Sequence, residues 1–353
     1  MQTTIIRSRT QKRALAMSAI AMLLASQAQA HDFCVSTATG LQNALTDSSD
    51  GGMYAGELNQ VFVVRGTYST GSATSNGAFH YHNSTISARL YLRGGWNSGC
   101  TSQKQKAALT VLDGNNSTQV LSLRQADGEL DVTALTIQNG ETTRKGAGVE
   151  VNFVSGDNAR VVMTGNIIRN NHTTNSDGGL YVASGGDTVF LENNVITDNS
   201  ADGGNGAGSY ISAGVGVVYN NTVARNTTTM TGGTGGLSFS SSVNGFVVGN
   251  IFWNNTTYGI YLASANVRLD YNDYGTQGGV TPSTTIGDLS TDPKFVDAAG
   301  GDYHLMGNSP LLGTTASPSI ASIDPDGNDV PAGGKGDMGA YNETVFTDGF
   351  DGG

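Results

Sequence analysis

The chain has 353 residues, a net charge of −11 and only 13% charged residues, and 50 of its residues are glycine. An acidic chain whose basic residues form no patch beyond residue 30 is a poor ligand for nucleic acid or anionic membranes, so we exclude both as partners. Low charge and many Gly, Asn and Thr residues are typical of disorder, but regularly spaced apolar pairs supply the surface that a core must bury.

Residues 1–30 are predicted to be a signal peptide. The basic segment 7–13 precedes the apolar run 14–26, and Ala-Gln-Ala at 28–30 has the small-residue form of a cleavage site. No other stretch is long enough to span a membrane, so we expect an exported, soluble chain that begins at His31.

Residues 31–60 are predicted to form an N-terminal cap. Three apolar residues recur with helical spacing in the segment 39–49, which predicts a short helix that plugs the end of the fold. The two cysteines, Cys34 and Cys100, lie in the exported part of the chain, where two thiols most simply form one structural disulfide.

Residues 61–280 contain a repeat of 27–29 residues, whose units begin at Asn166, Asn194, Asn221 and Asn250. Short β-branched runs precede and follow each of these asparagines. The unit is too short for a strand–helix–strand crossover and has no helical periodicity, so we predict about three short strands and three corners per unit. Stacked in parallel, such units form an all-β fold, a single-stranded right-handed parallel β-helix.

A second asparagine recurs five residues after the first. Stacked amides at one corner can hydrogen-bond one another and the backbone, and asparagine tolerates left-handed geometry there. We therefore predict a structural column, with a binding role as the alternative, at Asn171, Asn199, Asn226 and Asn255.

An aromatic stripe is the best candidate for a binding surface. In the strands near residues 180, 209, 237 and 260, apolar residues alternate inward, and the residues between them point outward. These outward residues are Glu150, Tyr181, Tyr210, Ser238 and Tyr261. Exposed tyrosines on successive turns form a platform suited to sugar rings, and the alternative is ordinary aromatic stacking that protects a sheet. Loop length varies most at the adjacent corner, where solenoids usually carry function.

No catalytic residues are predicted. Glu192 and Asp270 share one outward position but lie three turns apart, roughly 14 Å, which exceeds the spacing of a glycosidase pair. Asp198 and Arg225 occupy equivalent positions on adjacent turns and are expected to form an ion pair of small energetic effect. Two further acids lie in the variable loops, where they could approach each other: Asp177 and Asp202.

No metal and no cofactor are predicted either. His80 and His82 alternate on one strand face but lack a third ligand, and His31 at a processed N-terminus is only a weak copper candidate. The segment 324–335 starts like a calcium loop, but its sixth and twelfth positions are Asp329 and Lys335, so we expect a turn instead.

The ends of the chain resemble a known group. GLQNAL, VFVVRGTY, YLRGGWNSGC and TVLDGNN look like segments of exported bacterial pectin-lyase-like β-helix proteins. DPKFVDAAGGDYHLMGNSPLLGT and DPDGNDVPAGGKGDMGAY are similar to the C-terminal region of the choice-of-anchor Q family. Asn342 departs from that pattern, since the family usually has an acidic residue directly after the final tyrosine. The resemblance implies an envelope or extracellular protein but no particular reaction.

The segment 281–341 loses the repeat and gains prolines, which predicts an irregular C-terminal cap, and residues 342–353 form a tail. We expect an exported, non-catalytic surface protein of a bacterium that contacts a polysaccharide or cell-surface glycan along Glu150, Tyr181, Tyr210 and Tyr261. The alternatives are a polysaccharide lyase or glycoside hydrolase acting on an acidic polysaccharide, and a purely structural envelope protein. The sequence leaves the oligomeric state open.

Overall fold

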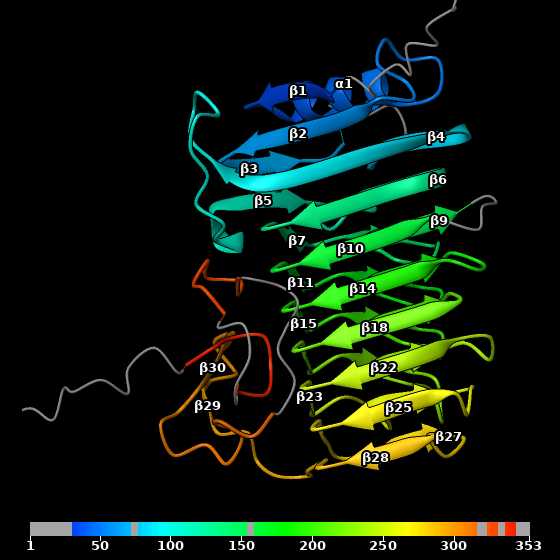
Figure 1. Ribbon diagram of the computed structural model, residues 1–353, viewed down its shortest axis with the longest axis vertical. Coiled ribbons are helices and arrows are strands. Elements are labelled where there is room, and N and C mark those ends of the chain that lie inside the picture. Colours follow the sequence, from blue (N-terminus) through cyan, green and yellow to red (C-terminus); the bar gives the residue numbers. More distant parts are fainter. Residues whose placement is uncertain (1–29, 72–76, 154–158, 316–322, 331–335, 344–353) are drawn as a thin grey trace, which may run out of the picture.

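The computed structural model describes residues 30–71, 77–153, 159–315, 323–330 and 336–343 (Figure 1). Within these ranges the chain is the predicted parallel β-helix, with strands stacked along one long axis and one α-helix at its N-terminal end. The predicted signal peptide, apart from Ala30, and residues 344–353 of the predicted tail lie outside the described residues.

One rung of the solenoid passes through four positions. Sheet A holds two columns of strands, which we call column I and column II. A rung runs through column II, turns into sheet B, turns again into sheet C and returns by a loop to column I. The sequence predicted about three strands per unit. The two-residue strands of sheet C are a fourth, and their sequence is too short to produce a recognisable pattern.

The middle rungs repeat this path with matching registers. Column I contains β9 (Val149–Phe153), β13 (Leu180–Ala183), β17 (Ser209–Ser212), β21 (Leu237–Phe239), β24 (Ile260–Leu262) and β27 (Gln277–Gly279). Column II contains β10 (Arg160–Thr164), β14 (Thr188–Glu192), β18 (Val215–Tyr219), β22 (Asn244–Val248), β25 (Val267–Asp270) and β28 (Thr284–Ile286).

Sheets B and C complete each rung. Sheet B contains β3 (Gly66–Ser69), β5 (Thr110–Asp113), β7 (Thr136–Gln138), β11 (Ile167–Arg169), β15 (Val195–Thr197), β19 (Thr222–Ala224), β23 (Ile251–Trp253) and β26 (Asp273–Tyr274). Sheet C contains β8 (Glu141–Thr142), β12 (His172–Thr173), β16 (Ser200–Ala201) and β20 (Thr227–Thr228).

The N-terminal rungs are built differently. Here β4 (Phe79–Trp96) and β6 (Leu121–Thr133) run continuously through both columns, whereas the later rungs turn between them. Gly128 makes this bend possible, since its φ is 101° and a Cβ at that position would lie 1.9 Å from the carbonyl oxygen of Ala88. Above them lie β2 (Leu58–Val64), β1 (Ala30–Val35) and α1 (Ala38–Ser48).

The helix α1 is the predicted plug. The Thr37 side chain accepts a hydrogen bond from the Gly40 amide at 3.0 Å, so it caps the first turn. Leu41 and Leu45, one turn apart, are fully buried against the open end of the core. The apolar spacing of a short segment was therefore sufficient to predict this helix.

Two ladders of asparagine side chains hold adjacent rungs together at the corners beside sheet B. In one ladder, the Asn171 amide donates to Asn199 Oδ1 at 2.9 Å, Asn199 to Asn226 at 2.9 Å, and Asn226 to Asn255 at 3.1 Å. Each amide also donates to a backbone carbonyl, as Asn199 does to Ile168 O at 3.0 Å. The other ladder joins the first asparagine of each unit: Asn166, Asn194, Asn221, Asn250 and Asn272.

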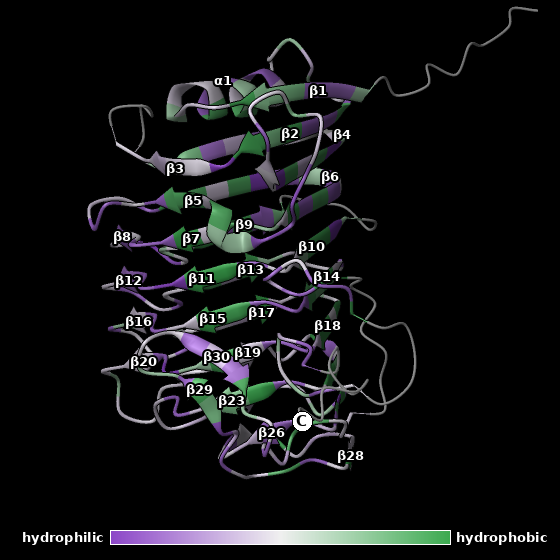
Figure 2. Cartoon of the chain, turned by 90° about the vertical axis from the view of Figure 1, so that its left-hand side faces the viewer, coloured by the Kyte–Doolittle hydropathy of each residue, from purple (hydrophilic) through white to green (hydrophobic). Residues whose placement is uncertain are grey.

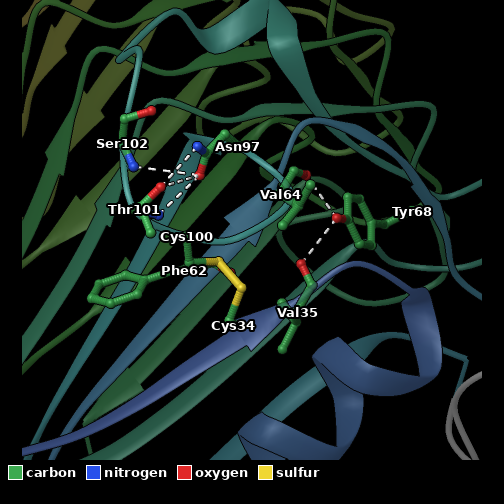
Figure 3. The surroundings of a disulfide bond; sticks show 9 residues. All are labelled: Cys34, Val35, Phe62, Val64, Tyr68, Asn97, Cys100, Thr101 and Ser102. Atoms are coloured by element: carbon green, nitrogen blue, oxygen red, sulfur yellow. Dashed lines mark hydrogen bonds between the residues drawn. A yellow bond between two sulfur atoms is a disulfide. The ribbon is translucent and has the colours of Figure 1, made fainter.

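The predicted disulfide joins Cys34 of β1 to Cys100, with the two Cα atoms 5.8 Å apart and a sequence separation of 66 (Figure 3). Next to it, the buried Tyr68 hydroxyl donates to the carbonyls of Val64 at 2.7 Å and Val35 at 3.2 Å. A covalent bond and a buried tyrosine therefore attach the first strand to the solenoid.

The described C-terminal residues beyond β28 (Thr284–Ile286) leave the repeat and add no further strand to the solenoid. The hairpin of β29 (Phe295–Asp297) and β30 (Asp302–Leu305) packs instead against the outer face of sheet B, in front of β19 and β23 (Figure 2). This packing buries apolar surface, because sheet B carries outward-facing residues such as Val195 and Ile251, which are buried together with Phe295 and Tyr303 of the hairpin.

Candidate glycan-binding face

The outward residues of column I form one continuous line. The strand registers pair His80 with Ser122, Ser122 with Glu150, and each of these with the next rung, which gives the line His80, Ser122, Glu150, Tyr181, Tyr210, Ser238 and Tyr261. Six steps of about 4.8 Å make this line roughly 29 Å long, enough for several sugar units. We call the part of this line from Glu150 to Tyr261 the tyrosine stripe.

The tyrosine stripe is less exposed than the sequence predicted. Tyr181 and Tyr210 are half-buried and stack with ring centroids 5.6 Å apart and planes within 7°. Glu150 and Ser238 are only 6% and 4% exposed, because the corner loops cover them. Tyr261 forms a second aromatic pair with Tyr258, at 5.8 Å. The stripe is therefore two aromatic patches separated by a covered serine.

A lysine and a buried acid adjoin the first patch. Lys145 Nζ lies 4.6 Å from the ring centroid of Tyr181 and 5.7 Å from that of Tyr210. The same Nζ lies 3.9 Å from Asp177 Oδ2, which also accepts a hydrogen bond from the Ser176 hydroxyl at 2.9 Å. The Asp177 side chain is fully buried, and burial raises its pKa to about 6, against the lowering effects of Ser176 and Lys145.

Burial also raises the pKa values of Tyr181 and Tyr210, and the nearby Asp177 carboxylate adds to the effect. Both phenols therefore stay protonated and neutral at ordinary pH. Asp202, which the sequence placed in a neighbouring loop, is exposed, unlike Asp177.

Glu150 is held by hydrogen bonds from three side chains. Arg144 donates to its oxygens at 3.3 and 3.4 Å, Asn152 at 2.9 Å and Gln119 at 3.2 Å. Its burial and this set of donors make Glu150 a positioning residue for Arg144, whose side chain is 69% exposed.

A groove of about 860 Å³ continues the line at its N-terminal end, where β4 and β6 run through both columns. Its described walls are Ala78, His80, Tyr81, His82, Gln119, Ser122, Arg124, Arg144, Asn152 and Phe153. His80 and His82 also border a second groove of about 760 Å³ beside the loop that follows α1. We call the first of these the arginine groove.

The described walls of the arginine groove include cationic and neutral side chains but no acid. Arg124 is exposed and forms no ion pair within the described part of the chain, and Arg144 is shared only with the buried Glu150. In a chain with a net charge of −11 this is a local positive surface. Arg124 and Arg144 were not predicted as site residues, because nothing in the sequence around either one indicates that a groove opens beside it.

The comparison with family models agrees with this architecture. The model described as "Right handed beta helix region" matches residues 90–274, more than half of the chain. The chain belongs to the right-handed β-helix family. Searches of curated proteins and of solved structures each found no significant match to this β-helix protein.

The remaining predicted positions of this β-helix lie apart from the groove. Glu192 and Asp270 share the outer edge of column II, with Tyr219 and Val248 between them in register, and both acids are buried. The expected inter-rung ion pair is present, with Arg225 Nε 2.7 Å from Asp198 Oδ1.

The segment after residue 324 forms a turn, as expected, in which Asp324 Oδ1 accepts from the amides of Asp326 and Asn328 at 2.9 Å. The His31 ring stacks on Tyr54 with centroids 3.4 Å apart. Among the described residues, no group of three or more His, Cys, Asp or Glu side chains is arranged to hold a metal. The described part of the β-helix also has no helix with the length and hydrophobicity of a membrane span.

Proposed function

We propose that this right-handed β-helix is an exported, non-catalytic protein that binds an extended acidic glycan along the outer face of column I. The observation that carries the proposal is the continuity of one surface. Stacked tyrosines and a lysine lie on the middle rungs, and the same line of residues enters the arginine groove.

The aromatic part supports a sugar ligand. A sugar ring presents C–H groups on its faces and hydroxyls at its edge, and half-buried tyrosines offer both an apolar face and a polar tip. The rings of Tyr181 and Tyr210 are stacked and nearly parallel, with centroids 5.6 Å apart on adjacent rungs, so their exposed edges follow one another along the axis of the solenoid. A chain of sugar units lying along that axis would meet one rung after another.

The charges support an acidic ligand. Guanidinium groups bind carboxylates and sulfates through paired, charge-assisted hydrogen bonds. Arg124 is exposed without an acidic partner among the described residues. The side chain of Arg144 is positioned by its ion pair with Glu150. A neutral polysaccharide would leave the Arg124 cation without a counter-charge in the complex.

Export is part of the proposal. The basic and apolar start of the sequence and the disulfide support an oxidising, extracytoplasmic compartment. The likeness of the C-terminal motifs to the choice-of-anchor Q family supports the surface of a bacterial cell, and the predicted division into residues 1–30, 31–60, 61–280, 281–341 and 342–353 belongs to this proposal.

A glycan array probed with the protein from His31 onward tests the proposal. We expect binding to polysaccharides rich in uronate or sulfate, and a loss of about tenfold or more in the Tyr181→Ala, Tyr210→Ala double variant. Arg124→Gln should lower the affinity for acidic glycans alone by about tenfold.

The matched controls lie on column II, where Tyr91→Ala and Arg160→Gln remove a tyrosine and an arginine from the other outer face. Both controls should bind as the parent does. Failure of the parent to bind any acidic glycan, or equal loss in the controls, would remove the proposal.

A second candidate function is a polysaccharide lyase or glycoside hydrolase. The observation that favours it is the fully buried Asp177, whose pKa is raised to about 6, beside Lys145 and two tyrosines, since displaced pKa values gather at catalytic sites. Release of unsaturated or reducing ends from an acidic polysaccharide, abolished in Lys145→Ala, would establish it. A purely structural envelope protein would show neither binding nor release.

A further inference from the structure

A separate pocket of about 230 Å³ lies between the outer face of sheet B and the C-terminal segment. Its floor comes from the solenoid, with Arg169 at the end of β11 and the corner residues Asp198 and Arg225. Its other wall comes from Gly300 and Gly301 in the β29–β30 turn and from Tyr341. The pocket is on a different sheet from column I and plays no part in the function proposed above.

The solenoid side of this pocket presents its charges from one set of corners. Asn170, Asp198 and Arg225 occupy the same corner on successive rungs, and all three have left-handed backbone geometry, with φ of 55°, 55° and 57°. Backbone hydrogen bonds fix their order, because the Asn170 amide donates to Thr197 O and the Asp198 amide to Ala224 O. The side chains are therefore held at the pocket by the solenoid itself.

The charges of the pocket do not cancel. Arg225 Nε pairs with Asp198 Oδ1 at 2.7 Å, and the other oxygen of Asp198 accepts from the Tyr303 hydroxyl at 3.3 Å. Asp198 is thus already engaged on both oxygens. Arg169 donates from Nε and Nη2 to the neutral Gln138 Oε1, at 3.0 and 2.9 Å, and forms no ion pair within the described ranges. Among the residues that line the pocket, one positive charge therefore remains.

Hydrogen-bond donors outnumber acceptors at the same place. Arg169 uses two of its three nitrogens on one amide oxygen, so Nη1 keeps both of its hydrogens. Arg225 uses only Nε in its pair with Asp198, so its two terminal nitrogens are also available. Asn170 is exposed at the rim, and its side chain makes no hydrogen bond within the described part of the chain.

We propose that this pocket binds a small oxyanion, with Arg169 as the residue that recognises its charge. The ligand chemistry is a carboxylate, sulfate or phosphate group, carried either by an inorganic ion or by a single acidic monosaccharide. A volume of about 230 Å³ is smaller than the roughly 300–1,000 Å³ of pockets that hold larger organic ligands, so a longer glycan does not fit.

Such a ligand would connect two parts of the fold. Its oxygens contact arginines of the solenoid, and it lies beneath the turn that joins β29 and β30. Binding therefore stabilises the packing of the C-terminal hairpin on sheet B, and it adds to the stability of the whole chain by mass action.

The experiment uses the protein from His31 onward and compares sodium sulfate, sodium glucuronate and glucose at constant ionic strength set with sodium chloride. At a concentration about 100-fold above the dissociation constant, a bound anion should raise the Tm by roughly 3–5 °C. Hydrogen exchange should slow in the segment 295–305. Glucose should do neither.

Arg169→Gln should weaken anion binding by about tenfold or more, whereas Arg160→Gln on column II should leave it unchanged. Sulfate binding alone identifies an inorganic oxyanion site, and glucuronate binding alone identifies a sugar-acid site; both results support the proposal. Equal responses to glucose and glucuronate, or full binding by Arg169→Gln, would overturn it.

Discussion

The middle rungs and the N-terminal rungs of this solenoid are stabilised in different ways. Between β10 and β26, two asparagine ladders pass from rung to rung, and every ladder amide finds both a side-chain and a backbone partner. The N-terminal rungs lie beyond these ladders and have a helix, a disulfide and two long, bent strands instead. The comparison teaches that the ladders satisfy the asparagine amides rung by rung, whereas the irregular end, which lacks these ladders, is held by a covalent bond and a buried helix.

The largest effect should come from breaking a ladder in its middle. Asn199 makes four side-chain hydrogen bonds, two as donor and two as acceptor, and it is fully buried. Asn199→Ala leaves its partners unsatisfied in the interior, so we expect a loss of about 4–5 kcal/mol in the free energy of unfolding. Urea denaturation measures it.

The control is Asn152→Ala in the arginine groove, where the amide makes one hydrogen bond to Glu150 at 2.9 Å. It should cost about 1 kcal/mol. Equal losses in the two variants would mean that the ladder contributes nothing beyond an ordinary hydrogen bond.

The N-terminal rungs should depend on their covalent bond. Replacing both Cys34 and Cys100 by serine opens a loop of 66 residues, and the chain-entropy relation gives a loss of about 4 kcal/mol. Hydrogen exchange should locate the loss at β1 and α1 rather than at β18. Uniform loss of protection over the whole solenoid would show that the two regions unfold as one unit.

A smaller effect is expected from the buried acid beside the tyrosine stripe. Because burial raises the pKa of Asp177 to about 6, the folded chain binds this proton more tightly than the unfolded chain does. The stabilising contribution is complete below about pH 4 and is lost as the pH rises through 6. Asp177→Asn should therefore be more stable than the parent at pH 7, by about 2 kcal/mol, with no advantage at pH 4.

Thermal unfolding of both proteins between pH 4 and pH 7 measures this difference. Burial also raises the pKa values of Asp273, Asp288 and Glu343, but these groups are shared by the two proteins and cancel in the comparison. Asp202→Asn, at an exposed loop position, is the matched control and should follow the parent. A constant difference across the range would contradict the assignment to Asp177.

The smallest change should come from the groove itself. Arg124 is exposed and has no ion-pair partner among the described residues, so Arg124→Gln should change the free energy of unfolding by less than about 0.5 kcal/mol. The same variant should lower the affinity for acidic glycans. Loss of stability and loss of binding together would place Arg124 in the structural framework instead.

The sequence predicted those features that repeat or that depend on local spacing. The period that places Asn194 after Asn166 also fixes the strand order, and the alternation around Tyr181 fixes which side chains face the core. The disulfide could be predicted because the chain has two cysteines and was expected in an oxidising compartment. Each of these follows from a pattern inside a window or from a single period.

Other features depend on how distant segments pack. The coverage of Glu150 by Arg144 depends on a loop path, and the opening of the groove depends on β4 and β6 failing to turn. The C-terminal hairpin packs on the side of the solenoid, because its apolar residues are buried against the outer face of sheet B at Val195 and Ile251. No periodic pattern in the sequence indicates this loop path, these long strands or this packing of the hairpin.

The rungs shorten toward the C-terminus: along the ladder that begins at Asn166 the spacing is 28, 27 and 29 residues, and then 22 and 16. The last strand of column II, β28, has only three residues. One of its edges pairs with β25, so only the other edge could pair with a further strand. A second molecule that approached this end would find a strand edge of three residues, which provides too few backbone hydrogen-bond partners for strand addition. The taper therefore limits the strand edge that this end of the solenoid presents for fibre formation.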